Sequence, residues 1–291
     1  MKKIIPINRM TLCQRLRNYL HSPLSFLIFL LVTLAALFSV FILLFLVVYI
    51  LIMGIPHLTP ELFAFKYDSD NVSMFPAIIT TVQTVVLSLL IAAPLGIGCA
   101  IYLTEYAKKS NRLVPIIRLT AETLSGIPSI VYGLFGMLFF VTALHWGFSL
   151  LAGVCTLSIM VLPVVMRSTE EALLSVPDAY REASFGLGAG RLHTILKVVL
   201  PSAVPGILAG MILAIGRIIG ETAALIYTAG TVAQIPKDVF QSGRTLAIHM
   251  YALSNEGLHV GEAYATAVVL LLTVLLINTF ASVIAKKIAK V

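Results

Sequence analysis

Charged side chains are scarce in this sequence. Asp, Glu, Lys and Arg make up only 11% of its 291 residues, whereas hydrophobic residues make up 59%. A soluble domain usually has about 25% charged residues. The shortage therefore excludes an ordinary soluble domain and predicts a protein that crosses a membrane several times.

Sequence patterns of catalysis are also missing. There is no G-x-x-x-x-G-K-[ST] that would cradle ATP, no H-E-x-x-H and no G-x-S-x-G. His193 and His249 are isolated in the sequence, and the three cysteines have no spacing typical of a zinc site or a disulfide framework. We therefore expect no catalytic residue, no metal ligand and no cofactor bound by this chain.

Long hydrophobic runs predict an all-α membrane protein with six transmembrane helices. Each run is long enough to cross a hydrocarbon core of about 30 Å. The predicted spans are residues 25–53, 77–103, 122–144, 148–166, a fifth that begins near 203, and 261–285.

The distribution of charge predicts how these spans are oriented. Residues 1–24 form a basic tail without a single acid, and residues 286–291 form a second basic tail. Residues 54–76 instead carry three acids and one lysine. Because basic connections remain in the cytoplasm, both termini are predicted to be cytoplasmic and residues 54–76 to lie outside.

The longest polar interval covers residues 168–201, on the predicted cytoplasmic side. Its apolar spacing predicts two short helices around a glycine turn, with Gly188 suited to a left-handed helix stop. Two such helices could read DNA, but four basic and four acidic residues balance each other between Arg167 and Pro201. Because nucleic-acid binding requires a basic surface, we expect a soluble protein partner and no nucleic acid.

Six residues of this interval carry a family pattern. They are Glu182, Ala183, Ser184, Gly188, Leu200 and Pro201. The interval resembles the EAA loop of ABC-importer permeases (the MetI-like family), E-A-A, three residues, G, nine residues and I-x-L-P, from which only Ser184 and Val198 depart. The resemblance implies a type I permease fold and a coupling loop that docks on a separate ATPase, which holds the ATP and magnesium.

The fifth predicted span combines glycines with two charges. Its four glycines fall within an arc of about 120° on a helix, which favours close helix packing. They are Gly206, Gly210, Gly216 and Gly220. Arg217 and Glu221 are spaced i, i+4, so they can pair on a helix. Since charges inside a membrane are costly, the two residues are predicted either to line a pore between two permease subunits or to tether the span as a structural ion pair.

The third predicted span is interrupted. Gly126 and Pro128 break its helix, and Ser125 and Ser129 place hydroxyl groups beside the interruption. Irregular backbone at this depth is tolerated where it lines a cavity or is buried in protein. The serines are predicted either to bind an oxyanion together with Arg217 or to satisfy the backbone groups that the kink frees.

Three segments are similar to the phosphate-specific branch of the importer family. They read ETLSGIPSIVYGLFG, GRIIGETAALIYTAG and APLGIGCAIYLTEYAKK, and the last two look most like its A-type permease subunit (PstA). The resemblance covers about residues 72–285, a five-helix core that follows a first membrane helix. Within it, Arg217, Glu221 and Arg244 match charged positions near the translocation path of that branch.

This resemblance also implies a location and an assembly. The location is the bacterial cytoplasmic (inner) membrane, in contact with lipid. The assembly contains a sister permease subunit (PstC-like), a dimer of ATP-binding subunits (PstB-like) and an extracytoplasmic phosphate-binding protein (PstS-like).

The sequence leaves two other functions open. An importer of another oxyanion, sulfate or molybdate, would carry the same EAA loop. A membrane scaffold or sensor bound to the ATPase would also carry it, but such a role makes no demand for two charges on a glycine face. A secondary carrier is disfavoured because the sequence shows no internal repeat.

Overall fold

The computed structural model describes residues 23–108 and 111–288, and the chain divides into two compact units at Ile52. The first unit contains most of helix α2 (Pro23–Gly54), which has 32 residues and is apolar on every side. A helix without a polar face is typical of a membrane span. The bounds of α2 agree with the first predicted span, whereas residues 1–22 of the predicted basic tail lie outside the described residues.

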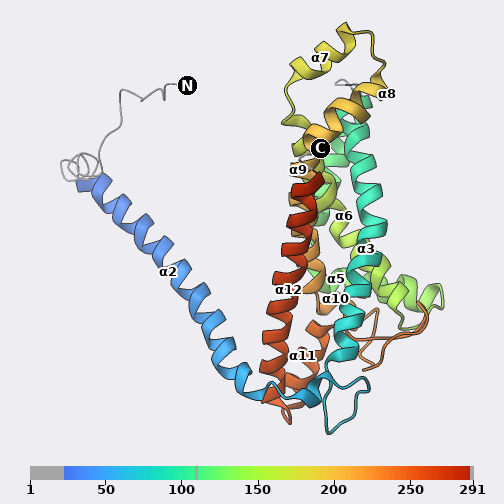
Figure 1. Cartoon of the computed structure of the whole chain (residues 1–291). Coiled ribbons are helices and arrows are strands. Elements are labelled where there is room, and N and C mark those ends of the chain that lie inside the picture. The colour runs from blue at the N-terminus through green and yellow to red at the C-terminus, as the bar shows by residue number, and fades with distance from the viewer. Residues whose placement is uncertain (1–22, 109–110, 289–291) are drawn as a thin grey trace. The chain divides into compact units, whose positions relative to one another are not determined.

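Four long helices lie side by side in the second unit (Figure 1). They are α3 (Phe75–Ile101), α6 (Leu150–Leu174), α9 (Leu200–Ile219) and α12 (Val260–Ile288). Helix α6 packs against both α3 and α9, and α12 packs against α9. Buried apolar side chains such as Leu157, Met160 and Val161 of α6 form the main core. Helix α6 is therefore the centre of this bundle.

The prediction of an all-α membrane protein is confirmed. Five helices are long and apolar enough to cross a membrane, and a bent pair of helices adds a sixth span if its two parts cross together, which agrees with the six predicted. The described residues form no strand. Among the shorter helices of the second unit, α7 and α8 lie at one end and α11 at the other (Figure 1).

The third span differs from the prediction. It consists of α4 (Leu113–Ser125) and α5 (Ser129–Gly136), which a π-helical stretch continues to Ala143. The two parts are bent by 99° at Gly126–Pro128. The predicted interruption at Gly126 and Pro128 is confirmed, because Pro128 lacks an N–H group and its ring disfavours a helical residue before it. The helical part before the break begins at Leu113, earlier than the predicted start near residue 122. Helix α4 occupies most of the connection that was expected before this span.

Both ends of the polar interval 168–201 are more helical than predicted. Helix α6 continues past the predicted end at residue 166 to Leu174. On the other side, α8 (Arg191–Thr194), a π-helical stretch and α9 form one span from Arg191 to Ile219, so the fifth span does not begin near residue 203. Pro201 is accommodated because it lies in the first turn of α9, directly after the wider π-helical turn.

The part of the interval between these spans is formed as predicted. Helix α7 (Asp178–Gly186) begins after Pro177 and ends before a glycine turn. Gly188 has a φ of 83°, the left-handed conformation expected of a helix stop there.

The opposite end of the second unit is built from short elements. They are two 3₁₀ helices (Ile55–His57 and Pro60–Phe63), α10 (Ala223–Ile226) and α11 (Leu246–Glu256). Leu62, Val72 and Met74 are buried against Leu246 and Leu253 of α11. This second apolar cluster fixes the segment before α3 onto α11.

Two of the four glycines of the fifth span lie against α6. A Cβ atom at Gly210 would stand 2.3 Å from the Cβ atom of Ser168, and one at Gly206 would stand 2.6 Å from that of Ala172. A Cβ atom at Gly216 meets nothing within 4 Å, and one at Gly220 meets only the Gly216 carbonyl. Gly216 and Gly220 therefore do not pack against a neighbouring helix in the described part of the chain.

We expect Gly210→Ala to separate α6 from α9. The added methyl group has no space beside Ser168, and overpacking of this kind costs about 1–3 kcal/mol. The midpoint of thermal unfolding in detergent should fall. Gly216→Ala is the matched control, because its methyl group meets open space and alanine favours a helix. Equal midpoints for the two variants would contradict the close packing at Gly210.

Candidate functional site

Arg217 lies in the last turn of α9. The helix ends at Ile219, and the Gly220 N–H donates to the Gly216 carbonyl at 3.3 Å. A cation is favourable at this position because the carbonyl end of a helix carries partial negative charge. The Arg217 side chain is half-buried and makes no ion pair with any described residue.

Glu221 does not continue the helix of Arg217. Its backbone lies beyond the end of α9, and its buried carboxylate accepts a hydrogen bond of 3.0 Å from the Ala224 N–H at the start of α10. The structural ion pair, one of the two alternatives for Arg217 and Glu221, is therefore not formed among the described residues. Their spacing fits a helix, but the helix ends between them, and the carboxylate caps the next one.

Helix α10 packs against α5, so the two interrupted spans meet. A Cβ atom at Gly133 of α5 would stand 2.8 Å from the Ala224 Cα atom. The ends of α9 and α10 thus lie at the bend between α4 and α5.

Tyr132, rather than a serine, satisfies the backbone at this bend. Its hydroxyl group donates to the Leu124 carbonyl at 2.7 Å. The Ser125 hydroxyl group donates to the Ala121 carbonyl of its own helix at 3.1 Å, and Ser129 is half-buried at the start of α5. The sequence analysis missed Tyr132, although its position four residues after Pro128 was a usable signal.

Arg244 lies at a different place, directly before α11. Its side chain is buried, and its guanidinium group lies 4.4 Å from the centre of the Tyr67 ring. Its backbone N–H donates to the Val232 carbonyl at 3.1 Å. Nothing in these contacts joins Arg244 to Arg217.

Three of the six EAA-loop residues line a shallow groove on α7 and its glycine turn. Glu182, Ala183 and Gly188 are exposed, whereas Ser184 is buried, with its hydroxyl group 2.8 Å from that of Thr194. The groove has a volume of about 720 Å³ and is lined by Ala183, Ser184 and Gly188 among others. Leu200 is half-buried and Pro201 exposed at the start of α9. Leu187 is 90% exposed, so the tip of the loop presents apolar surface.

Arg181 anchors α7 to Glu105, which lies in the π-helical stretch Tyr102–Tyr106 that continues the end of α3. Its Nη2 and Nε atoms donate to Glu105 Oε1 at 2.7 and 3.1 Å, and both side chains are largely buried. The same guanidinium group donates to the carbonyls of Val176 and Leu173. Sequence analysis missed this pair because its members are 76 residues apart.

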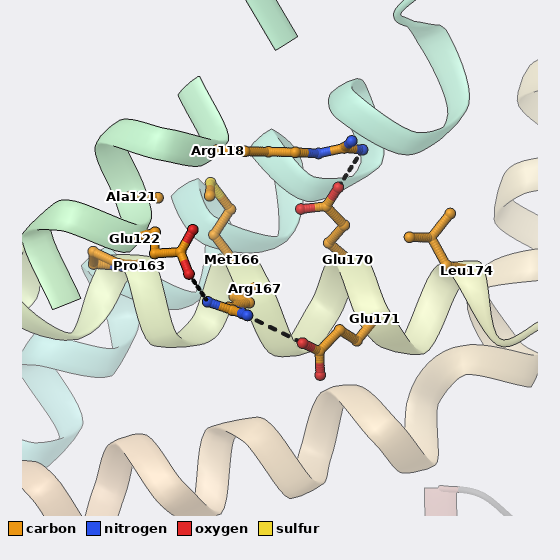
Figure 2. Close-up of a pocket in the computed structure, with 9 residues that line it drawn as sticks. All are labelled: Arg118, Ala121, Glu122, Pro163, Met166, Arg167, Glu170, Glu171 and Leu174. Carbon is orange, nitrogen blue, oxygen red and sulfur yellow. Dashed lines mark hydrogen bonds and ion pairs between the residues drawn. The ribbon is translucent and has the colours of Figure 1, made fainter. Parts of the chain in front are cut away.

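A charged cavity of about 280 Å³ lies between α4 and α6 (Figure 2). Arg118 of α4 lies 2.5 Å from the buried carboxylate of Glu170 of α6. Arg167 lies 3.4 Å from both Glu122 and Glu171, which are exposed. The Arg118–Glu170 and Arg167–Glu122 contacts join α4 to α6, whereas the Arg167–Glu171 contact lies within α6.

We expect Arg118→Ala to destabilise the packing of α4 on α6, because it leaves the buried Glu170 charge without its partner. Breaking a buried pair costs about 3–5 kcal/mol, and since Arg118 is half-exposed we expect about 1–2 kcal/mol here. Arg167→Ala is the control, because exposed pairs contribute less than about 1 kcal/mol. Hydrogen exchange of α4 should accelerate in Arg118→Ala alone. Similar exchange in both variants would contradict the special role of Glu170.

Comparison with known proteins identifies the family. Residues 92–290 match the model of the binding-protein-dependent transport system inner membrane component. The chain belongs to this family. Solved structures agree on the fold: an alginate ABC importer matches with a TM-score of 0.67 at 18% identity, over 94% of this chain and 99% of that one. The MetNI methionine importer matches with a TM-score of 0.58 at 20% identity, over 74% and 94%.

The curated relatives of this permease are closer in sequence. It is 40% identical over 209 residues to the probable ABC transporter permease protein YqgI of Bacillus subtilis, covering 66% of this chain and 70% of YqgI. It is 35% identical over 284 residues to the phosphate transport system permease protein PstA of Pasteurella multocida, covering 93% and 95%. PstA 2 of Mycobacterium tuberculosis is 46% identical over 154 residues, covering 53% and 50%. The chain is a permease subunit of an ABC importer, and the predicted resemblance is confirmed.

Proposed function

We propose that this permease imports inorganic phosphate and forms half of the translocation pathway, with a sister permease subunit forming the other half. Arg217 carries the proposal. It is a half-buried cation at the end of a membrane span, beside the bend of another span, and it has no ion-pair partner among the described residues. An intramembrane charge of this kind marks a solute path, and a cation attracts an anion.

The groups around Arg217 fit the same role. Glu221 caps α10 and so fixes the short helix that contacts α5. Ser129 is half-buried at the start of α5, where its hydroxyl group adds a donor, while Ser125 donates to its own helix. The PstA relatives, one matched over 95% of its length, are named for phosphate transport and favour this anion.

Transport by this permease depends on ATP hydrolysis in other subunits. In our proposal α7 and its glycine turn are the coupling loop, which docks on a dimer of ATP-binding subunits that hold ATP and magnesium. The exposed Glu182, Ala183 and Leu187 supply a surface of mixed polarity for that contact. The chain itself binds no cofactor and performs no catalysis.

The proposed orientation follows from the coupling loop. The end with α7 faces the cytoplasm of a bacterial cell, and the end with α11 faces outward, where an extracytoplasmic phosphate-binding protein delivers the anion. The chain then resides in the cytoplasmic membrane.

Uptake of labelled phosphate at low concentration, in cells without this gene, tests the proposal. We expect the deletion to lose uptake, the wild-type gene to restore it, and excess sulfate or molybdate to leave it unchanged. Competition by sulfate or molybdate would instead favour the importer of another oxyanion. Unchanged phosphate uptake in the deletion strain would contradict the phosphate proposal and leave an importer permease for a different solute.

A further inference from the structure

The start of α11 gathers buried polar atoms that have no partner. Arg244 is 5% exposed, Thr245 2% and His249 0%. Four of their side-chain atoms make no hydrogen bond: Arg244 Nε and Nη2, Thr245 Oγ1, and the His249 ring nitrogen that does not face the Val72 carbonyl. Buried polar atoms are almost always hydrogen-bonded. Four such atoms within six residues therefore indicate that this place holds something besides the chain.

Charge indicates what kind of group is missing. Arg244 forms no ion pair with any carboxylate in residues 23–108 and 111–288. A buried cation without a counter-ion costs several kcal/mol. The N-terminal end of α11, which has 11 residues, adds partial positive charge at the same position. The missing group is therefore an anion.

The orphan atoms of Arg244 also restrict its shape. Nε and Nη2 lie on one edge of the guanidinium group and donate two parallel hydrogen bonds, which match two oxygens of a carboxylate or phosphate. The Tyr67 ring lies 4.4 Å from this guanidinium group and 6.2 Å from the His249 ring, so both side chains converge on one place. This arrangement suits an anion with at least two oxygens.

His249 favours an anion that carries an O–H group, because one of its ring nitrogens can accept a hydrogen bond. Burial and the nearby Arg244 charge lower the pKa of His249 to about 3, while the Val72 carbonyl acts in the opposite direction. The ring is therefore neutral, with one N–H donor and one bare nitrogen that accepts. Phosphate at neutral pH keeps an O–H group that can donate to this nitrogen, whereas sulfate has none.

Thr245 completes the set of groups. It occupies the N-cap position of α11, but its side chain makes no capping bond. The Leu246 N–H, which a capping group often faces, donates instead to Thr81 Oγ1 at 2.9 Å. The Thr245 hydroxyl group thus remains available, and it can donate or accept.

We propose that Arg244, Thr245 and His249 form a binding site for one inorganic phosphate ion at the α11 end of this permease. The inference rests on phosphate as the transported anion and adds a second site to that of Arg217. The segment with Tyr67 and Val72 covers the site and encloses it together with α11. The bare nitrogen of His249 makes the site selective for phosphate over sulfate.

Direct binding tests the site. The membrane complex of permease and ATPase subunits is reconstituted in nanodiscs without the soluble binding protein, and equilibrium binding of labelled phosphate is measured with sulfate as competitor. We expect Arg244→Gln to weaken phosphate binding at least about tenfold, and sulfate to compete at least about tenfold less well than unlabelled phosphate. His249→Phe should reduce this preference, and Lys237→Gln, which removes an exposed cation outside both sites, should leave phosphate binding unchanged.

A second variant, a folding control and a structure determination show whether a loss of binding comes from the site itself. Arg244→Lys retains the charge without the parallel donors, and recovery of the intact complex with its ATPase activity shows that each variant folds. Cryo-electron microscopy at saturating phosphate should show tetrahedral density beside Arg244. Density of water only, or unchanged binding in Arg244→Gln, would overturn this inference even if cells take up phosphate. If the complex binds phosphate at the α11 site but the cells show no phosphate uptake through it, the proposed function is contradicted, whereas the inference of a phosphate site at α11 stands.

Discussion

Replacing Arg217 with alanine is expected to reduce phosphate uptake roughly tenfold to a hundredfold. A hydrogen bond to a charged group contributes about 1.5–3 kcal/mol, and each 1.4 kcal/mol is about a factor of ten. The loss should appear as reduced uptake of labelled phosphate by cells that carry only the variant. Arg217→Lys should recover part of the uptake, because lysine keeps the charge but lacks the parallel donors of arginine.

The variant should still assemble, which separates a solute contact from a structural tether. Arg217 forms no ion pair among the described residues, and the nearby Glu221 carboxylate is engaged with the Ala224 N–H. Removing the cation therefore leaves no carboxylate without its partner. Copurification with the ATPase and the unfolding midpoint should remain close to wild type.

Lys237→Ala is the matched control for Arg217→Ala. Lys237 is an exposed cation in the connection between α10 and α11. Its loss should leave uptake unchanged. Normal uptake by Arg217→Ala, or an equal loss in both variants, would remove Arg217 from the proposed pathway.

The local features of this permease could be predicted from its sequence. The six spans follow from long apolar runs, and the left-handed turn at Gly188 follows from the absence of a Cβ atom. The break at Gly126–Pro128 was also expected, because proline cannot continue a helix. Its angle of 99° was not, since it depends on how α5 packs against α6 and α10.

The end of α9 shows where sequence patterns stop being informative. Arg217 and Glu221 have helical spacing, and nothing in their neighbours forbids a helix through Gly220. The helix ends at Ile219, and beyond it Ala224 lies against Gly133 of α5, a contact between residues about 90 positions apart. Burial of Arg244 beside Tyr67 is a contact of the same long-range kind. The sequence therefore identified candidate functional residues more readily than it identified the residues that contact them in the folded protein.

The anchor of the coupling loop is one of these long-range contacts, and its loss should have a large effect. Glu105→Ala leaves the guanidinium group of Arg181, which is 15% exposed, with two backbone carbonyls and one exposed carboxylate. Removing one partner of a buried ion pair costs about 3–5 kcal/mol. Because this is most of the stability of a marginal local unit, α7 should detach from the end of α3.

Detachment of α7 should separate ATP hydrolysis from transport. We expect Glu105→Ala to lower phosphate uptake more than tenfold while the ATPase subunits continue to hydrolyse ATP, and to accelerate hydrogen exchange of α7. Asp178→Ala is a matched control on the same arginine: Asp178 lies 3.1 Å from Arg181, but its side chain is 88% exposed. An exposed pair contributes less than about 1 kcal/mol, so this variant should transport normally. If Asp178→Ala impairs uptake as much as Glu105→Ala, burial of the pair does not explain the coupling.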